Sequence, residues 1–283
     1  MNYSIITPTK NEGRFIEETI KSVIAQEQKP AEWFIMDDDS TDNTSEIVGR
    51  YSNDYTFIKY IKLSSFMNHL RNTGGRVAAI INYADLLRTI PVDLIVKADG
   101  DTSFGKDYFT RMIHEFMTEP RLGIASGHLV ENGVPEKIKD RIGGRGASLI
   151  IRYSCFLQIG KFYESRTRGE DSLALVAARA LGWKTWTFDY YFNHLKPEGI
   201  RKSTWENHFV TGCYKGSIPY WLPFFIGNAA RDLARKPYFL GSLIQVYGYI
   251  LSCYIHRERP FPEFVTRQFR HEQRSKFRIY IGL

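Results

Sequence analysis

The sequence has 283 residues, of which 43% are hydrophobic and 24% are charged, a composition that excludes a disordered or fibrous chain and allows one large domain with an appendage. The formal net charge of +7 at pH 7 favours an anionic partner, such as a nucleotide diphosphate, a nucleic acid or an acidic membrane surface, without choosing among them. The three cysteines, Cys155, Cys213 and Cys253, have no metal-ligand spacing and form no disulfide framework, and no secretory signal opens the printed sequence. We therefore expect a cytoplasmic protein, because thiols stay reduced there.

Short apolar runs alternate along the chain with segments whose apolar residues recur at helical spacing. The runs predict strands at 3–7, 32–36, 57–63, 93–98 and 122–130. The segments between them predict helices at about 13–27, around 47–48, from 76 to 87 and from 106 to 119. Such alternation is typical of parallel strands joined by right-handed crossovers, with a ligand crevice at their carboxyl ends. We expect an α/β fold with a Rossmann-like, mostly parallel sheet flanked by helices.

Carboxylates gather where two of these strands end. Asp99 and Asp101 flank a glycine directly after the strand at 93–98, and Asp37–Asp39 follow the strand at 32–36. Two carboxylates one residue apart repel each other unless a cation lies between them, and such oxygen ligands suit Mg²⁺ or Mn²⁺. The alternative interpretation of this Asp-Gly-Asp is a solvated turn. Farther along, Asp42 or Thr44 is expected to be the N-cap of the next helix.

Neither a dinucleotide-binding glycine fingerprint nor a P-loop occurs in the sequence, so any phosphates must be held by other means, and a metal on Asp99 and Asp101 is the substitute we expect. A third acidic pair, Glu170 and Asp171, opens a helix that ends near Gly182. A carboxylate in a first helical turn is favoured by the helix dipole, so simple capping is the alternative to a functional role there.

Taken together, residues 5–12, 36–42, 98–101 and 169–171 resemble four motifs of the family 2 glycosyltransferases, which have the GT-A fold. The resemblance covers about residues 1–195, and the four motifs in order are far more specific than any one of them. It implies a nucleotide-diphospho-sugar donor and an inverting transfer. The donor-binding residues that it implies are Pro8, Asn11, Glu12, Asp38, Arg76, Asp99 and Asp101.

The resemblance also implies the chemical roles. Asp99 and Asp101 match the family's Asp-x-Asp, which holds the ribose and, through Mn²⁺ or Mg²⁺, the diphosphate. Asp171 matches the general base that takes the proton of the acceptor hydroxyl, while Glu170 orients its surroundings. His194 lies where some members supply a third metal or phosphate contact, although a lone histidine is more often structural. Farther along, the loop at 201–202 supplies two cations that would close over phosphate or remain solvated.

Two departures from the family pattern matter. No Gln-x-x-Arg-Trp follows Asp171 and no multi-span membrane region is present, so we expect single-sugar transfer rather than processive synthesis. Asp39 stands where the family usually has Gly or Asn, which leaves the base contact open between Asp38 and its neighbours.

The last third of the chain is rich in aromatic and apolar residues. The block at 238–255 has 18 uncharged residues between basic flanks, which is the lower limit for a membrane-spanning helix, and its glycines and tyrosines favour an interfacial helix instead. A basic tail from Arg267 to Arg278 would add attraction to anionic lipid. The alternative is a helical subdomain that buries this face against the catalytic domain or a second subunit.

We therefore predict a catalytic domain at 1–204, with a nucleotide-sugar-binding half at 1–130 and an acceptor-side half at 131–204, and a helical region at 205–283. The predicted reaction moves one sugar, from a UDP-sugar by preference, to a lipid-linked or glycan acceptor at the inner face of the cell membrane. A homodimer is left open, and no nucleic-acid partner is expected.

One alternative, a sugar nucleotidyltransferase, would need a glycine-rich basic loop after the first strand, whereas residues 7–13 contain only one Lys and one Gly. The other is a non-catalytic membrane- or nucleic-acid-binding protein on the same scaffold, which retention of every acid disfavours.

Overall fold

The computed structural model describes residues 1–63, 75–137, 140–164, 169–196, 204–233, 239–255 and 261–280. The chain forms two compact units. The first, which we call the sheet unit, comprises Met1–Asn72, Arg76–Glu164 and Glu170–Glu198. The second, the helical unit, comprises Gly199–Leu283 together with the short segments Thr73–Gly75 and Ser165–Gly169.

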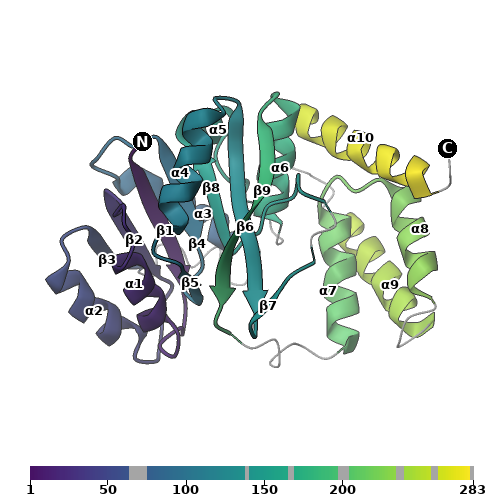
Figure 1. Cartoon of the computed structure of the whole chain (residues 1–283). Helices are drawn as coiled ribbons and strands as arrows, with labels where there is room; N and C mark the ends of the chain where they lie inside the picture. The colour runs from purple at the N-terminus through teal and green to yellow at the C-terminus, as the bar shows by residue number, and fades with distance from the viewer. Residues whose placement is uncertain are drawn as a thin grey trace. The chain divides into compact units, whose positions relative to one another are not determined.

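Among the described residues, the sheet unit is built on one nine-stranded mixed sheet with the order β3-β2-β1-β4-β8-β6-β9-β5, and β7 pairs with β6 (Figure 1). The strands are β1 (Tyr3–Thr9), β2 (Glu32–Asp37), β3 (Ile58–Lys62), β4 (Leu94–Ala98), β5 (Thr102–Phe104), β6 (Leu122–Glu131), β7 (Val134–Pro135), β8 (Ser148–Arg152) and β9 (Lys184–His194). The helices of this unit are α1 (Ile16–Ile24), α2 (Thr44–Asp54), α3 (Arg76–Leu87), α4 (Tyr108–Thr118), α5 (Tyr153–Gln158) and α6 (Glu170–Ala180).

The sheet has a parallel half and a mixed half. Strands β3, β2, β1 and β4 are parallel neighbours, as the alternation of strands and helices predicts. Strand β8 then pairs antiparallel with both β4 and β6, while β6 and β9 are parallel. The expected α/β class is confirmed, but the parallel arrangement stops at β4. The carboxyl ends of β1, β2 and β4 consequently lie together at one edge of the sheet.

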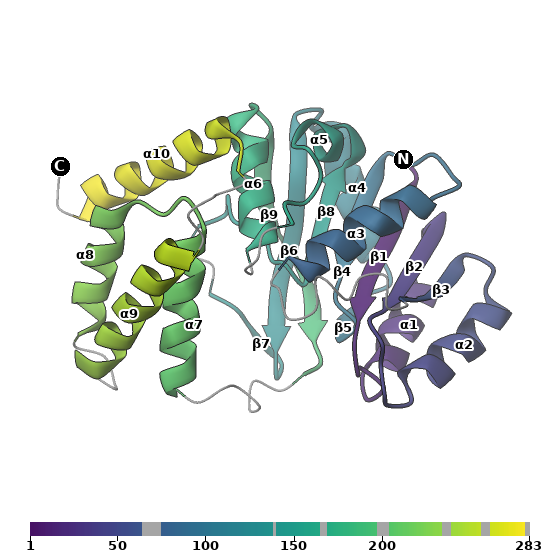
Figure 2. The same cartoon turned by 180° about the vertical axis from the view of Figure 1, so that it is seen from behind.

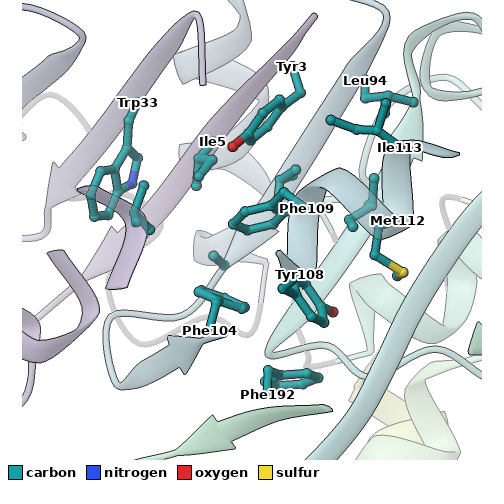
Figure 3. Close-up of a cluster of buried hydrophobic side chains, with 14 of the residues drawn as sticks. Tyr3, Ile5, Trp33, Leu94, Phe104, Tyr108, Phe109, Met112, Ile113 and Phe192 are labelled. Carbon is teal, nitrogen blue, oxygen red and sulfur yellow. The ribbon is translucent and has the colours of Figure 1, made fainter. Parts of the chain in front are cut away.

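A cluster of buried aromatic side chains packs against one face of this sheet (Figure 3). The ring of Phe104 lies 4.9 Å from that of Phe109 and 6.0 Å from that of Phe192, and Phe109 lies 5.2 Å from Tyr3. Tilted aromatic pairs at these distances add to the free energy gained from burial. Helices α1 and α4 cover this face (Figure 1), and α3 covers the other (Figure 2). The cluster therefore joins β1, β5, β9 and α4 into one packed body beneath the strand ends.

The start of α2 differs in detail from the prediction. The helix begins at Thr44 with Asn43 in the N-cap position, whereas the sequence predicts Asp42 or Thr44 there. The carboxylate of Asp42 does accept the backbone N–H of Thr44, at 3.0 Å, but it also accepts that of Gly13, at 2.9 Å. Asp42 therefore lies one residue before the N-cap. From there its carboxylate bonds to the loop after β1, at Gly13, as well as to the first residue of α2.

The helical unit consists, in its described part, of α7 (Thr204–Ser217), α8 (Leu222–Asp232), α9 (Phe239–Ile255) and α10 (Glu263–Tyr280). Helices α7 and α9 cross closely because glycines line the crossing: a Cβ atom on Gly212, Gly216 or Gly248 would overlap backbone atoms of the facing helix. The apolar helix α9 does not reach the length and hydropathy of a membrane span, and neither does any other helix of the described residues. The two basic flanks of the 238–255 block lie outside the described residues.

Candidate functional site

The loops that follow β1 and β2 are tied together by Asn11. Its backbone N–H donates to Ser40 Oγ at 2.9 Å, and its side-chain oxygen accepts the backbone N–H of Thr41 at 2.8 Å. Asn11 adopts a left-handed backbone conformation with φ 54°, which asparagine tolerates better than most residues. Pro8, one of the expected donor-binding residues, lies within β1 opposite Met36 of β2. Asn11 thus holds one loop against the other at the edge of the sheet.

Asp38 and Arg76 form a buried ion pair at this edge. The guanidinium donates from Nε and Nη2 to the two carboxylate oxygens of Asp38, and both side chains are about one-tenth exposed. Lys10 Nζ lies 3.8 Å from the same carboxylate. A bidentate arginine fixes the plane of a carboxylate. The structure therefore brings together two of the residues that the family resemblance assigns to the nucleotide base.

The two neighbours of Asp38 differ from it. Asp37 is buried and accepts hydrogen bonds from the Tyr60 hydroxyl at 2.6 Å and from the backbone of Ser40 at 2.9 Å, so it supports the loop. Asp39 is exposed and has φ 61°. A left-handed conformation favours glycine or asparagine, the residues that the family resemblance leads us to expect at this position.

Asp99 and Asp101 lie at the end of β4. The glycine between them packs so tightly that a Cβ atom on it would lie 3.1 Å from Thr9 Oγ1, and its carbonyl accepts the hydroxyl of Thr19 at 2.9 Å. Burial raises the pKa of Asp99, although 41% of the side chain is exposed. The carboxylates of Asp171 and Asp101 raise that pKa further, and Lys97 opposes them.

His194 ends β9 and lies between two carboxylates. Its Nε2 is 3.3 Å from Asp101 Oδ2, and its Nδ1 is 3.4 Å from Glu131 Oε1. The contact with Asp101 raises the pKa of the imidazole, with a further contribution from Glu131. The sheet makes this meeting possible, because β9 pairs with β5 on one side and β6 on the other. His194 and Asp101 are far apart in sequence and adjacent in the fold.

Glu12 faces the same edge from the loop after β1. Lys196 Nζ donates to its Oε1 at 3.1 Å, while Oε2 is buried and makes no hydrogen bond with the described residues. Burial raises the pKa of this carboxyl, and Asp101 and Asp99 add to the effect. Burying a carboxylate oxygen without a hydrogen-bond partner costs free energy, unless a bound ligand supplies the partner. The structure thus places Glu12 beside the Asp-Gly-Asp turn, together with a cation.

Asp171, in the first turn of α6, is held by Lys97. The ammonium donates to Asp171 Oδ2 at 3.1 Å and to the carbonyl of Gly146 at 2.6 Å, and lies 3.6 Å from Asp99 Oδ1. Although burial opposes it, the carboxylates of Asp99 and Asp171 raise the pKa of Lys97. The other oxygen of Asp171, Oδ1, is buried and makes no hydrogen bond with the described residues. Lys97 thus connects Asp171, in the first turn of α6, to Asp99 of the Asp-Gly-Asp turn.

The side chains of Asp99, Asp101 and His194 fit a divalent metal ion whose other ligands would mainly be phosphate oxygens. The described residues contain no group of three or more His, Cys, Asp or Glu side chains close enough to enclose a metal. Mg²⁺ and similar ions are commonly held by only one or two carboxylates, with substrate phosphates and waters completing the shell. Asp101, backed by His194 and next to Asp99, supplies this kind of set.

The family model described as glycosyl transferase family 2 matches residues 4–216 of the chain. The chain belongs to this family. The resemblance to family 2 glycosyltransferases seen in the four motifs is confirmed. The matched segment includes every candidate site residue, from Pro8 to His194.

Curated relatives match this family 2 chain over part of its length. They include an uncharacterized glycosyltransferase of Mycoplasma genitalium, 28% identical over 132 residues, and the poly-beta-1,6-N-acetyl-D-glucosamine synthase of Staphylococcus aureus, 28% identical over 120 residues. These matches cover 46% and 42% of this chain. They span only 41% and 26% of the relatives' own lengths.

Solved structures share its fold. The mannosyltransferase PcManGT of Pyrobaculum calidifontis, in complex with GDP-Man and Mn²⁺, has a TM-score of 0.59 at 16% identity and covers 89% of this chain and 73% of that one. TarS of S. aureus, residues 1–349 in complex with UDP-GlcNAc, has a TM-score of 0.54 at 18% identity and covers 90% of this chain and 73% of that one. At these identities the likeness concerns the fold, which is the GT-A fold that the motifs predict.

The structure brings most of the candidate residues of this family 2 protein to one edge of the sheet, but sequence reasoning missed three neighbours. Lys97 could have been noticed as the lone charge in an apolar strand, on the same face as Asp99 because side chains alternate. No comparable feature of the sequence indicates that Gly146 or Lys196 lies near the site. The two cations at 201–202, expected either to close over phosphate or to remain solvated, lie outside the described residues.

Proposed function

We propose that the protein is an inverting, metal-dependent glycosyltransferase that moves one sugar from a nucleotide diphosphate sugar, with UDP favoured, to an acceptor hydroxyl. The observation that carries the proposal is the approach of Asp171 to Asp99 through Lys97, whose ammonium lies within 4 Å of both carboxylates. A carboxylate this close to the Asp-Gly-Asp turn supports the proposal that Asp171 is the base. The UDP-GlcNAc bound by TarS supports a UDP-sugar, and the GDP-Man bound by PcManGT keeps GDP as its competitor.

The proposed donor site is made of the loops after β1, β2 and β4. Asp38, with its plane fixed by Arg76, would contact the nucleotide base, and the loops joined by Asn11 would line the nucleoside together with Pro8 and Glu12. Asp99 and Asp101 would face the ribose and diphosphate. A divalent ion held by Asp101, Asp99 and His194 would offset the negative charge that develops on the diphosphate.

Asp171 would act as the base. Lys97 occupies its Oδ2, so Oδ1 is the oxygen that would accept the proton of the acceptor hydroxyl. As that proton leaves, the acceptor oxygen bonds to the anomeric carbon from the face opposite the diphosphate, and the bond from that carbon to the diphosphate oxygen breaks. A single displacement of this kind inverts the configuration. Lys97 would keep Asp171 in one orientation throughout.

We propose a lipid-linked or growing glycan as the acceptor, at the cytosolic face of a membrane. The support is the composition of the helical unit, whose uncharged helix α9 is accompanied by the basic helix α10. An enzyme that acts on a lipid-linked substrate benefits from peripheral attachment, because both are then confined to one surface.

The test is a calorimetric titration of the full chain with UDP, GDP and ADP, each with and without Mn²⁺. We expect binding of one nucleotide that depends on the metal, is lost in Asp101→Ala and is kept in the control Asp107→Ala, which changes a half-exposed aspartate at the start of α4. Asp171→Asn should keep nucleotide binding and abolish release of the nucleotide from its sugar conjugate. If none of the nucleotides binds, the transferase proposal is refuted.

A further inference from the structure

Helix α9 carries its apolar side chains on the outside. Its side chains that are between 56% and 70% exposed are Phe239, Leu240, Leu243, Tyr247, Ile250 and Tyr254. They recur every three or four residues after the first pair, so they form one continuous stripe along the helix. We call these six residues the α9 stripe.

The opposite face of α9 is buried, and apart from Tyr249 it consists of small or polar residues. Ser242, Gln245 and Ser252 are each at most 3% exposed. Ser242 Oγ donates to the carbonyl of Ala229 at 3.0 Å, and Gln245 accepts from Lys215 Nζ at 3.1 Å. Helices of water-soluble proteins normally bury the apolar face and expose the polar one. Helix α9 has the reverse arrangement.

The packing beneath the stripe is also of the kind used where hydrocarbon is the surrounding medium. Gly212 and Gly216 on α7, spaced as Gly-x-x-x-Gly, face α9, and Gly248 on α9 faces α7. Figure 2 shows these two helices side by side. Close backbone contact at small residues, with polar side chains bonded between helices, is typical of helix pairs in lipid. The neighbouring helix α8 likewise exposes Leu222 and Ile226, one turn apart.

The charge of the chain points to an anionic surface. Residues 199–283 contain 13 Lys or Arg against 5 Asp or Glu, whereas residues 1–198 contain 25 against 26. Helix α9 itself has no charged residue, but basic residues stand close to both of its ends in the sequence, at 235–236 and at 257 and 259. The exposed cations of α10 in the same unit are Arg267, Arg270, Arg274, Lys276 and Arg278.

We propose that the α9 stripe is a membrane-docking surface that enters the outer hydrocarbon of an anionic bilayer, with α9 parallel to the membrane plane. The stripe provides the buried apolar area and the basic residues provide the attraction to lipid headgroups. Tyr247 and Tyr254 suit the boundary between headgroups and acyl chains. A second copy of this chain is disfavoured as the occupant, because it would bring together two strongly basic units. The inference builds on the membrane location proposed above and names the surface responsible.

The experiment is co-sedimentation of the full chain with vesicles of phosphatidylcholine alone and of phosphatidylcholine with anionic phosphatidylglycerol. The test variant is Leu243→Glu/Ile250→Glu. Its matched control is Leu86→Glu/Met117→Glu, which adds the same two negative charges at side chains of the sheet unit that are 71% and 62% exposed. We expect the wild-type chain and the control to bind the anionic vesicles, and the test variant to bind at least tenfold more weakly.

Three outcomes would overturn the proposal. If the test variant binds as well as the control, the attachment is electrostatic and the stripe is not inserted. If the wild-type chain ignores vesicles and light scattering shows a dimer that the test variant converts to monomer, the stripe is a subunit interface. If the wild-type chain is a monomer and does not bind vesicles, the α9 stripe binds neither a membrane nor a second copy of the chain. Vesicle binding needs no nucleotide, so these results are independent of the calorimetric test of donor binding.

Discussion

Gly146 lies directly against Asp171: a Cβ atom on this glycine would overlap the carboxylate oxygen Oδ2 and approach Lys97 Nζ to 3.5 Å. The same glycine supplies the carbonyl that accepts the Lys97 ammonium. The backbone of the loop before β8 thus shapes the position of the proposed base. A residue with no side chain is required where a backbone and a fixed carboxylate come this close.

Gly146→Ala should therefore displace Asp171 while leaving the donor loops in place. We expect the rate of nucleotide release from the sugar donor to fall by roughly 10²-fold, because a shift of about 1 Å in a reacting group has effects of that size. Nucleotide affinity in calorimetry should change little. The matched control is Gly143→Ala in the same loop, where the nearest atom to a new Cβ would be 3.8 Å away. Equal rates for the two variants would contradict the assignment of Asp171.

A second prediction concerns Lys97 as a positioning residue. Lys97→Met removes the cation that orients Asp171, and we expect at least a tenfold loss of turnover with nucleotide affinity nearly unchanged. Because Lys97 acts through Asp171, the double variant Lys97→Met/Asp171→Asn should be no slower than Asp171→Asn alone. Lys161→Met is the matched control, since it breaks another lysine–aspartate pair, with Asp85 at 2.8 Å. Additive losses in the double variant would show that Lys97 contributes to turnover independently of Asp171 and would contradict its positioning role.

The parallel half of the sheet and its acidic strand ends could be predicted from the sequence because their signals are local. An apolar run followed by Asp99-Gly100-Asp101 determines both a strand and what stands at its end. The contact of Lys97 with Asp171 joins residues 74 positions apart, and it exists only because β8 is inserted antiparallel next to β4. No local pattern encodes that insertion.

The helical unit likewise combines a feature that is local in sequence with one that depends on tertiary packing. The uncharged block at 238–255 was recognisable as an unusual helix, and α9 spans Phe239–Ile255. Which of its faces is buried depends on α7 and α8, whose glycines and polar groups select the side that carries Ser242 and Gln245. The inverted polarity of α9 is thus a property of the tertiary structure.

The third prediction tests the left-handed residue at the end of β2. Asp39 has φ 61°, a conformation that costs a residue with a Cβ atom about 1 kcal/mol relative to glycine. We expect Asp39→Gly to be more stable toward urea than Asp39→Ala by about that amount, since both remove the carboxylate and only glycine removes the strain. Equal free energies of unfolding for the two variants would mean that the strain is absent in solution.

The fourth prediction concerns the pH response of Cys155, whose side chain is fully buried. Burial raises the pKa of this thiol to about 12, against the opposing charge of Arg152. Only about one thiol in ten thousand would then be ionised at pH 8, and the thiolate is the reactive form. Iodoacetamide at pH 8, followed by peptide mass spectrometry, should leave Cys155 unmodified in the native protein and label it in guanidinium chloride. Equal labelling under both conditions would show that the site opens readily.

The last prediction contrasts two helical glycines. Gly216 on α7 has no room for a methyl group, because a Cβ atom there would overlap the carbonyl oxygen of Tyr249 and approach Ser252 to 2.9 Å. Gly216→Ala must therefore push α7 and α9 apart, at a cost of roughly 1–3 kcal/mol in the free energy of unfolding. Gly49 in α2 has no atom within 4 Å of a new Cβ, so Gly49→Ala should gain about 0.5–1 kcal/mol from helix propensity alone. Guanidinium titrations followed by circular dichroism would measure both. If Gly216→Ala were tolerated as well as Gly49→Ala, the close crossing of α7 and α9 would be wrong, and with it the burial of the polar face of α9.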